Sequence, residues 1–301
     1  MPASVGVRFA HAAVQALADD AGVDVLHIKG PAVDDRLLER RLEEDPETGV
    51  ADEHVVPRIS ADADVLVRPS HVGLLVDAMR SHGWTTKFRF EDGSAFEHAS
   101  TMVHEYVAPM DVHRSFPGIG LEPEAAFDRL WADRHGVPIA GYRCEVPSLP
   151  AQRVLLLLHA ARGGVGGNAD VPRSWEAATA TERAEIDALT SDLRAEVAIG
   201  AATGRLHLYT GRREHALWQA LSSGESSLVR IWAARVRAEP TYADRYRTAV
   251  RLLRPNPRRL EQALGRRPTR GELVGAYVER GRRGLQELGR LLSRPRRRRE
   301  G

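Results

Sequence analysis

Three aspartates stand in segments whose residue pattern predicts β-strands. Asp62 and Asp64 belong to ISADADVLV (residues 59–67), and Asp111 belongs to MDVH (110–113). Strand side chains alternate between two faces, so we expect Asp62 and Asp64, two residues apart, to share one face. Asp111 begins a later strand, and we expect it to lie beside this pair.

Neighbouring carboxylates repel one another, and burying them is costly unless a cation lies between them. Oxygen ligands of this kind select Mg²⁺ or Mn²⁺, which also bind phosphate oxygens and water. Two such ions would activate an attacking oxygen and stabilise a leaving phosphate. The alternative is a solvent-exposed strand face, but the apolar residues 65–67 favour a buried setting. Relief of repulsion predicts that Asp62→Asn or Asp64→Asn stabilises the metal-free protein.

Lys29 and Gly30 close the segment VDVLHIKG (23–30), which predicts a short strand and a glycine turn. Lys29 and Lys87 are the only lysines among 43 basic residues. A chain that uses arginine almost everywhere, yet has lysine beside this glycine, indicates a need for a compact ammonium group. Chance is the alternative.

Length and composition predict a soluble protein of ordinary type. The 301 residues suffice for two domains, and 43% hydrophobic with 28% charged residues is typical of globular chains. No apolar stretch approaches the roughly 18 residues of a membrane span, and the N-terminus lacks a secretory pattern. We therefore expect a cytoplasmic location and no membrane partner. A single cysteine, Cys144, excludes an intrachain disulfide and a cysteine-cluster metal site.

Charge is unevenly distributed along the chain. Residues 1–120 contain 20 acidic and 11 basic side chains, a net charge of −9, and the remainder carries +11. Residues 240–301 hold 18 arginines against six acids. This asymmetry indicates either an anionic partner or attraction between the two halves.

Hydrophobic periodicity predicts an α+β chain: an N-terminal unit with a mixed sheet and helices, then a mainly helical unit. The boundaries we expect are 1–121, 122–292 and a basic disordered tail at 293–301. Residues 43–56 have turn residues and acids without periodicity, which predicts a loop. Helices are expected at 4–20, after Pro31, at 71–83, and in the C-terminal unit at 122–133, 149–161, 181–202, 213–221, 226–238, 241–253 and 270–292. Further extended segments are expected at 84–90, 100–108, 110–116 and 141–147.

In their order, these motifs resemble a little-characterised bacterial nucleotidyltransferase family of the polymerase-β-like superfamily. Its pattern is Lys-Gly, then Arg-x-x-x-Asp-x-Asp-x-Leu-Val, then an acidic residue, a hydrophobic residue and His. This chain supplies HIKG (27–30), RISADADVLV (58–67) and MDVH (110–113). The resemblance covers about residues 20–132; one departure is Arg114, where an aromatic residue is expected. Some members are encoded beside genes for ribosomal peptides such as lasso peptides, which implies peptide natural product biosynthesis.

The resemblance implies transfer of a nucleoside monophosphate from an NTP to a hydroxyl or phosphate of an acceptor, a small molecule or a peptide. Mg²⁺ or Mn²⁺ would be the cofactor, held by the catalytic carboxylates Asp62, Asp64 and Asp111. Asp111 would also help to deprotonate the acceptor.

The same resemblance implies that Lys29, Gly30 and Arg58 bind the nucleotide. Gly30 would let the backbone approach the phosphates at the start of the following helix. Lys29 would contact a phosphate or orient the metal site, and Arg58 would pair with a phosphate or brace Asp62. His113 is expected to make a structural hydrogen bond.

Two other functions remain open at this point. A catalytically degenerate transferase fold would bind a peptide or nucleic acid, and the basic C-terminal third fits nucleic acid. Phosphoryl transfer would use similar metals. The glycine-rich segment 163–168 lacks the Lys-Ser or Lys-Thr of a phosphate-binding Walker loop, and no Gly-x-Ser-x-Gly motif supports a hydrolase.

Overall fold

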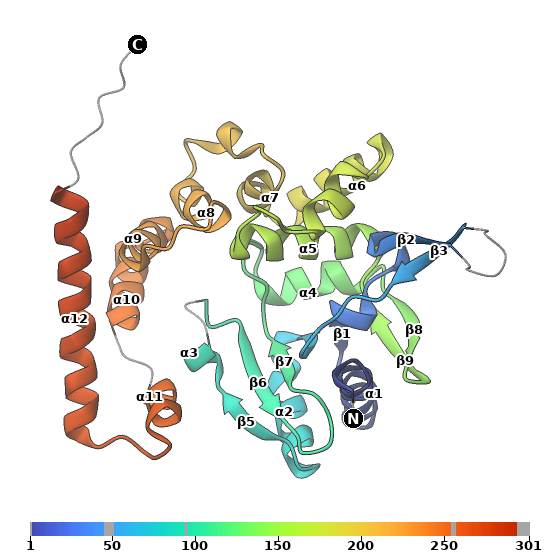
Figure 1. Ribbon diagram of the computed structural model, residues 1–301, viewed down its shortest axis with the longest axis horizontal. Coiled ribbons are helices and arrows are strands. Elements are labelled where there is room, and N and C mark those ends of the chain that lie inside the picture. The colour runs from blue at the N-terminus through green and yellow to red at the C-terminus, as the bar shows by residue number, and fades with distance from the viewer. Residues whose placement is uncertain (1, 45–50, 94–95, 254–256, 294–301) are drawn as a thin grey trace.

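A computed structural model describes residues 2–44, 51–93, 96–253 and 257–293 (Figure 1). The N-terminal elements are α1 (Ala3–Ala21), β1 (Val25–Ile28), the 3₁₀ turns η1 (Gly30–Ala32) and η2 (Asp35–Leu37), β2 (Glu39–Glu44), β3 (Ala51–Val56), β4 (Ala63–Val67), η3 (Pro69–His71), α2 (Val72–Ser81), β5 (Thr85–Phe88), α3 (Phe90–Gly93), β6 (Ala99–Val103) and β7 (Met110–His113).

The elements beyond residue 122 are mainly helical. They are α4 (Pro123–Trp131), β8 (His135–Ile139), β9 (Tyr142–Val146), α5 (Leu149–Gly163), a π-helical turn η4 (Pro172–Glu176), α6 (Ala180–Asp192), α7 (Glu196–Ala202), η5 (Leu206–Tyr209), α8 (His215–Ser222), α9 (Leu228–Ala238), α10 (Tyr242–Leu253), α11 (Pro257–Leu264) and α12 (Arg270–Ser293). The predicted α+β class is confirmed. The domain boundary at 121/122 stays a prediction, and all but the first residue of the predicted tail lies outside the described residues.

Five strands form one mixed sheet in the order β1-β4-β7-β6-β5. Only β4 and β7 run parallel; the other neighbours are antiparallel. A parallel pair needs a crossover, and α2, β5 and β6 lie between β4 and β7 in the chain. This crossover brings two motifs that are distant in sequence side by side at the centre of the sheet.

The two faces of the sheet pack against different helices. On one face, α1 and α2 cover an apolar core that includes Val65, Val112 and Met102. On the other, Leu26, Ile28 and Leu66 join the core formed by α4, α5 and α7 (Figure 1). Because strand side chains alternate, Asp64, Asp111 and His113 belong to the second face. The candidate site therefore lies between the sheet and the helical part.

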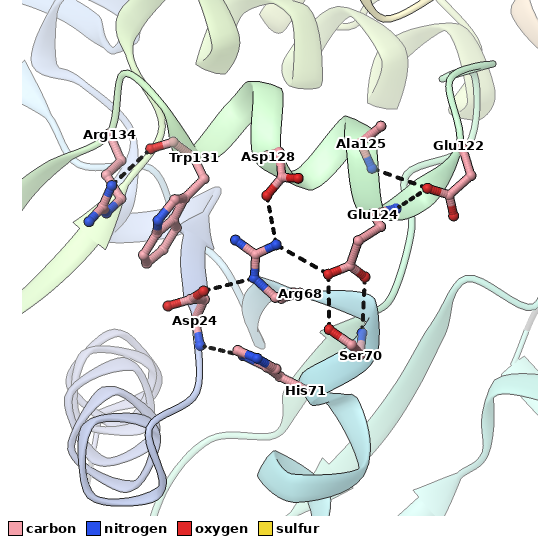
Figure 2. A network of polar contacts seen from close by, with 10 residues as sticks. All are labelled: Asp24, Arg68, Ser70, His71, Glu122, Glu124, Ala125, Asp128, Trp131 and Arg134. Carbon is pink, nitrogen blue, oxygen red and sulfur yellow. Dashed lines mark hydrogen bonds and ion pairs between the residues drawn. The ribbon is translucent and has the colours of Figure 1, made fainter.

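Arg68, directly after β4, attaches α4 to the sheet (Figure 2). Its guanidinium donates to Asp24 at 2.8 Å, to Glu124 at 3.1 Å and to Asp128 at 2.6 Å, and it lies over the Phe127 ring. Glu124 also accepts hydrogen bonds from the backbone and hydroxyl of Ser70. These bonds raise the pKa of Arg68 despite the opposing effect of burial. The cluster fixes the first helix beyond the sheet.

Residues 43–56 do not form the predicted loop, because β2 and β3 pair as an antiparallel hairpin around the undescribed residues 45–50. The hairpin carries no hydrophobic alternation: Leu42 is 76% exposed, and Arg40 pairs with Glu53 across the strands. Its strands were missed because charge pairing and backbone hydrogen bonds, not a buried face, hold it.

The predicted helix at 181–202 is broken into α6 and α7. Arg194 adopts φ 53°, and the freed carbonyl of Leu193 accepts hydrogen bonds from the backbone of Gly120 and Leu121, both at 3.1 Å. A Cβ on Gly120 would come within 2.8 Å of the Arg194 carbonyl oxygen, so a tertiary contact sets this break. The sequence prediction also missed α11 and β8. Among the described residues, no helix is both long and apolar enough to cross a membrane.

Candidate functional site

The site is a row of residues that crosses four strands. In register, Ile28 of β1 lies opposite Asp64 of β4, Asp64 opposite Asp111 of β7, and Asp111 opposite Thr101 of β6. Residues directly opposite in a sheet share a face, so both carboxylates point toward the helical part. Two aspartates from separate motifs thus stand side by side on the only parallel strand pair of the described sheet.

Asp64 is 3% exposed and accepts two hydrogen bonds on one oxygen. Lys29 Nζ lies 2.7 Å from its Oδ1, and His113 Nε2 lies 2.8 Å from the same atom. Burial by itself raises the pKa of Asp64, but the hydrogen bond from His113 and the charge of Lys29 outweigh it and hold the pKa well below its usual range. Asp64 is therefore charged in the metal-free protein.

Asp111 has the opposite electrostatic setting. Its Oδ1 accepts a hydrogen bond of 2.6 Å from Thr101, which lowers its pKa in part. Burial, together with the negative charges of Asp64 and Asp62, outweighs this bond and raises the pKa of Asp111. A carboxyl with a raised pKa accepts a proton more readily than an ordinary aspartate, which suits a general base.

Asp62 lies one residue before β4 rather than inside it, because the strand begins at Ala63 and not at Ile59 as predicted. Ser60 donates to the Asp62 carbonyl at 2.6 Å and to its Oδ1 at 3.2 Å, forming a tight turn. The side chain is half-buried, and its charge acts on Asp111. Asp62 therefore lies outside the row, and it is not among the three residues whose ligand atoms lie within 4.8 Å of one another.

Lys29 and Gly30 form a turn with two consecutive positive φ angles, 61° and 50°. A side chain on Gly30 would be strained at that φ and would meet Ser60 Cβ at 3.6 Å. The chain then continues as the short turns η1 and η2, so the predicted α-helix after Pro31 is wrong. A cavity of about 260 Å³ beside the turn is lined by Gly30, Arg58 and Ser60, among others.

Arg58 makes its bonds to the helical part rather than to Asp62. Its Nη2 donates to Asp170 Oδ2 at 2.9 Å, and its Nη1 donates to Asp170 Oδ1. Asp170 is buried, and it lies 112 residues away in the helical turn directly before η4. The suggested brace on Asp62 is therefore replaced by a bidentate ion pair that joins the segment before β4 to the helices.

The sequence analysis missed three polar residues over the site: His98 before β6, and His159 and Arg162 of α5. Arg162 Nη1 lies 2.5 Å from His98 Nε2, and its Nη2 lies 3.4 Å from His159 Nδ1. Burial is the main cause that lowers the pKa of His98 to about 2 and that of His159 to about 4. The available signal was a pair of polar residues three apart that follows the apolar run from Val154 to Leu158 in the same helix.

The residues at the centre fit a divalent cation. One ligand atom from each of Asp64, Asp111 and His113 lies within 4.8 Å of the others. His113 already donates a hydrogen bond to Asp64, so the two carboxylates are the oxygen donors that Mg²⁺ or Mn²⁺ prefers, and His113 orients one of them.

Comparisons with known proteins give similarity only at the level of solved structures. No protein-family model and no curated protein matches this sequence. The antibiotic-resistance factor ANT(2'')-Ia is 14% identical with a TM-score of 0.34, covering 66% of this chain and 89% of that one. The lincosamide antibiotic adenylyltransferase LnuA with bound lincomycin is 17% identical with a TM-score of 0.30, covering 60% and 94%. An antigenic nucleotidyltransferase-like protein from Paracoccidioides brasiliensis is 13% identical with a TM-score of 0.35, covering 72% and 93%.

Proposed function

We propose that this protein is a metal-dependent nucleotidyltransferase that moves a nucleoside monophosphate from an NTP to a hydroxyl or phosphate of an acceptor. The observation that carries the proposal is the pairing of Asp64 with Asp111, whose ligand atoms lie with His113 inside 4.8 Å. Two carboxylates on adjacent strands, with a third acid beside them, match what metal-assisted phosphate chemistry requires. The resemblance of the sequence motifs to polymerase-β-like transferases supports the same reaction.

Mg²⁺ or Mn²⁺ is the proposed cofactor, with Asp62, Asp64 and Asp111 as its protein ligands. When bound, the metal neutralises the triphosphate and stabilises the leaving pyrophosphate. His113 and Lys29 keep Asp64 charged and oriented for this role, since both donate to its Oδ1.

Asp111 is the proposed general base. Thr101 donates to its Oδ1, so Oδ2 is the atom that takes the acceptor proton. As the acceptor oxygen forms its bond to the α-phosphorus, the bond from phosphorus to pyrophosphate breaks and the proton passes to Asp111.

Lys29, Gly30 and Arg58 are the proposed nucleotide-binding residues. The cavity beside the glycine turn contains both Gly30 and Arg58, and the Lys29 ammonium lies between the turn and Asp64. A phosphate oxygen that enters this cavity would accept a hydrogen bond from the Lys29 ammonium, which also donates to Asp64. Arg58 would keep its ion pair with Asp170, so it would attract the phosphate by its charge and not by a bidentate hydrogen bond.

The test is incubation of the full chain with Mg²⁺, each NTP labelled at the α-phosphate, and a panel of hydroxylated small molecules and hydroxyl- or phosphate-bearing peptides. We expect release of pyrophosphate and a product heavier by one nucleoside monophosphate. Asp111→Asn should abolish both. Asp187→Asn, which breaks a surface pair with Arg205, is the matched control and should behave as wild type.

The same measurement separates the alternatives. Release of nucleoside diphosphate instead of pyrophosphate would indicate phosphoryl transfer. Binding of a peptide or nucleic acid that does not depend on Mg²⁺ or NTP, with no turnover for any acceptor, would indicate the degenerate binding protein. Asp64 and Asp111 lie side by side, and Asp62 lies just before the same strand as Asp64. The presence of all three acids favours the enzyme over the degenerate binding protein.

A further inference from the structure

Helix α5 brings a cation to the site that no motif predicted. Ten of its fifteen residues are buried, and Arg162 lies near its C-terminal end, where the helix passes over the sheet face that carries the aspartates. The guanidinium is half-buried, and the charges of Asp64 and Asp111 act on it. Arg162 therefore belongs electrostatically to the candidate site.

The partners recorded for Arg162 are neutral. A guanidinium only donates, so the facing nitrogens of His98 and His159 must be acceptors. Each ring then carries its single proton on the other nitrogen and is neutral. The lowered pKa values of both histidines agree with neutral rings. Among the ion pairs of the described residues, none includes Arg162, although two carboxylates lie within electrostatic reach.

Arg153, in the same helix, has a different set of partners. It donates to Glu182 at 2.7 Å and to the carbonyl oxygens of Arg173 and Ser174 at 3.1 and 3.0 Å. Its charge is paired inside the protein, whereas burial lowers the pKa of Arg162, which the charges of Asp64 and Asp111 only partly offset. A partly desolvated cation held by neutral groups gains most from an anion that arrives from outside.

We infer that Arg162 is a phosphate-binding residue, which holds the triphosphate from the helical side while Lys29 approaches it from the glycine turn; this rests on the proposed function. The charges of both residues act on His98 and His159, so they converge on one region. The planar fork of arginine matches two phosphate oxygens, and the two imidazoles hold its plane. The ligand class is a polyphosphate carrying a divalent cation.

Isothermal calorimetry with Mg²⁺ and inorganic tripolyphosphate, and separately with Mg²⁺ and an NTP, tests this assignment. Arg162→Gln should weaken both ligands by about 10- to 100-fold, because a hydrogen-bonded charge pair is lost. Arg162→Lys should recover part of the loss, since it keeps the charge but not the fork. Thermal melts show whether each variant is folded. If Arg162→Gln does not fold, the affinity of Arg162→Lys for the two ligands tests the assignment instead.

Arg247→Gln is the matched control, because it removes one positive charge from the exposed face of α10, where Arg247 pairs with Asp244. It should leave both dissociation constants unchanged. If wild type binds both ligands and Arg162→Gln binds them equally well, the assignment of Arg162 is wrong while the proposed function stands. If wild type binds neither ligand in the presence of Mg²⁺, the proposed function itself fails, and this assignment fails with it.

Discussion

The two charged clusters of β4 differ in how completely the protein satisfies them. At the end of the strand, Arg68 meets three carboxylates, each partly exposed to water (Figure 2). Its guanidinium also lies over the face of Phe127. Within the strand, Asp64 is buried beside a second carboxylate, Asp111. The first cluster is complete in itself and water screens its excess acid. In the second cluster two acids lie side by side and only Asp64 has a cationic partner, Lys29, so their repulsion is only partly offset within the protein.

The two clusters differ in charge balance, which distinguishes the structural cluster around Arg68 from the candidate site around Asp64 and Asp111. Arg68 joins α4 to the sheet, and its pKa is raised because every bond made by its guanidinium goes to an acid. In the site, the pKa of Asp64 is lowered and that of Asp111 is raised, although they lie side by side. In the metal-free protein Asp64 is therefore the more readily ionised of the two carboxyls and Asp111 the more readily protonated.

The largest expected effect comes from replacing each site aspartate by asparagine. Both Asp64→Asn and Asp111→Asn should lower turnover by about 10²- to 10³-fold or more. Their effects on the metal-free protein should be opposite. Asp64→Asn leaves Lys29 unpaired and should cost about 2–4 kcal/mol, whereas Asp111→Asn removes a disfavoured charge and should raise the melting temperature.

Denaturant unfolding in chelator measures this pair of stabilities. The structure corrects the expectation that relief of repulsion makes Asp64→Asn stabilising, because the Asp64 carboxylate accepts hydrogen bonds from Lys29 and His113. Equal destabilisation by both variants would contradict the opposed electrostatics.

Arg68→Met tests the structural cluster. It leaves Asp24, Glu124 and Asp128 facing one another without their cation, and water screens these partly exposed carboxylates, so the free energy of unfolding should fall by about 1–2 kcal/mol. Nucleotide affinity of the folded variant should stay within about threefold of wild type, a difference below 1 kcal/mol. Urea unfolding and calorimetry measure the two quantities, and a selective loss of affinity would place Arg68 in the site instead.

Lys29 sharpens the comparison, since it is the one cation paired directly with a site carboxylate among the described residues. Lys29→Met should reduce kcat/KM by about 10- to 100-fold, because it loses both a phosphate contact and the partner of Asp64. Lys29→Arg should lose less. Lys87→Met, at the edge strand β5, is the matched lysine control, and a kcat/KM equal to wild type is expected for it.

The smallest expected effect is on the free energy of unfolding at low pH. The pKa of His159 is lowered from 6.5 to about 4, so the unfolded chain takes up this proton first as pH falls. Stability from the neutral ring is complete above about pH 6.5 and is lost as pH falls toward 4, with a slope of at most about 1.4 kcal/mol per pH unit for one proton. His159→Gln should reduce this slope. His207→Gln, on the exposed side of η5, should leave it unchanged, and equal slopes for wild type and His159→Gln would refute the assignment.

The sequence alone determined the α+β class and where most helices and strands lie, because period-2 and helical apolar patterns reflect burial. Its motifs also indicated Asp64, Asp111, Lys29 and Gly30 as candidate site residues. It failed where burial was not the organising force, as in the hairpin of β2 and β3, and where a tertiary contact with Gly120 broke a helix.

Only the tertiary structure decided how the selected residues meet. The crossover between β4 and β7 sets Asp64 opposite Asp111, and β6 sets Thr101 beside it, pairings that depend on strand order and register. The fold also directed Arg58 to Asp170, and it brought Arg162 over the aspartates from α5, a helix that begins at Leu149. Local pattern fixes which face a side chain occupies, but its neighbours on that face come from distant segments, so long-range packing alone determined the charge balance of the site.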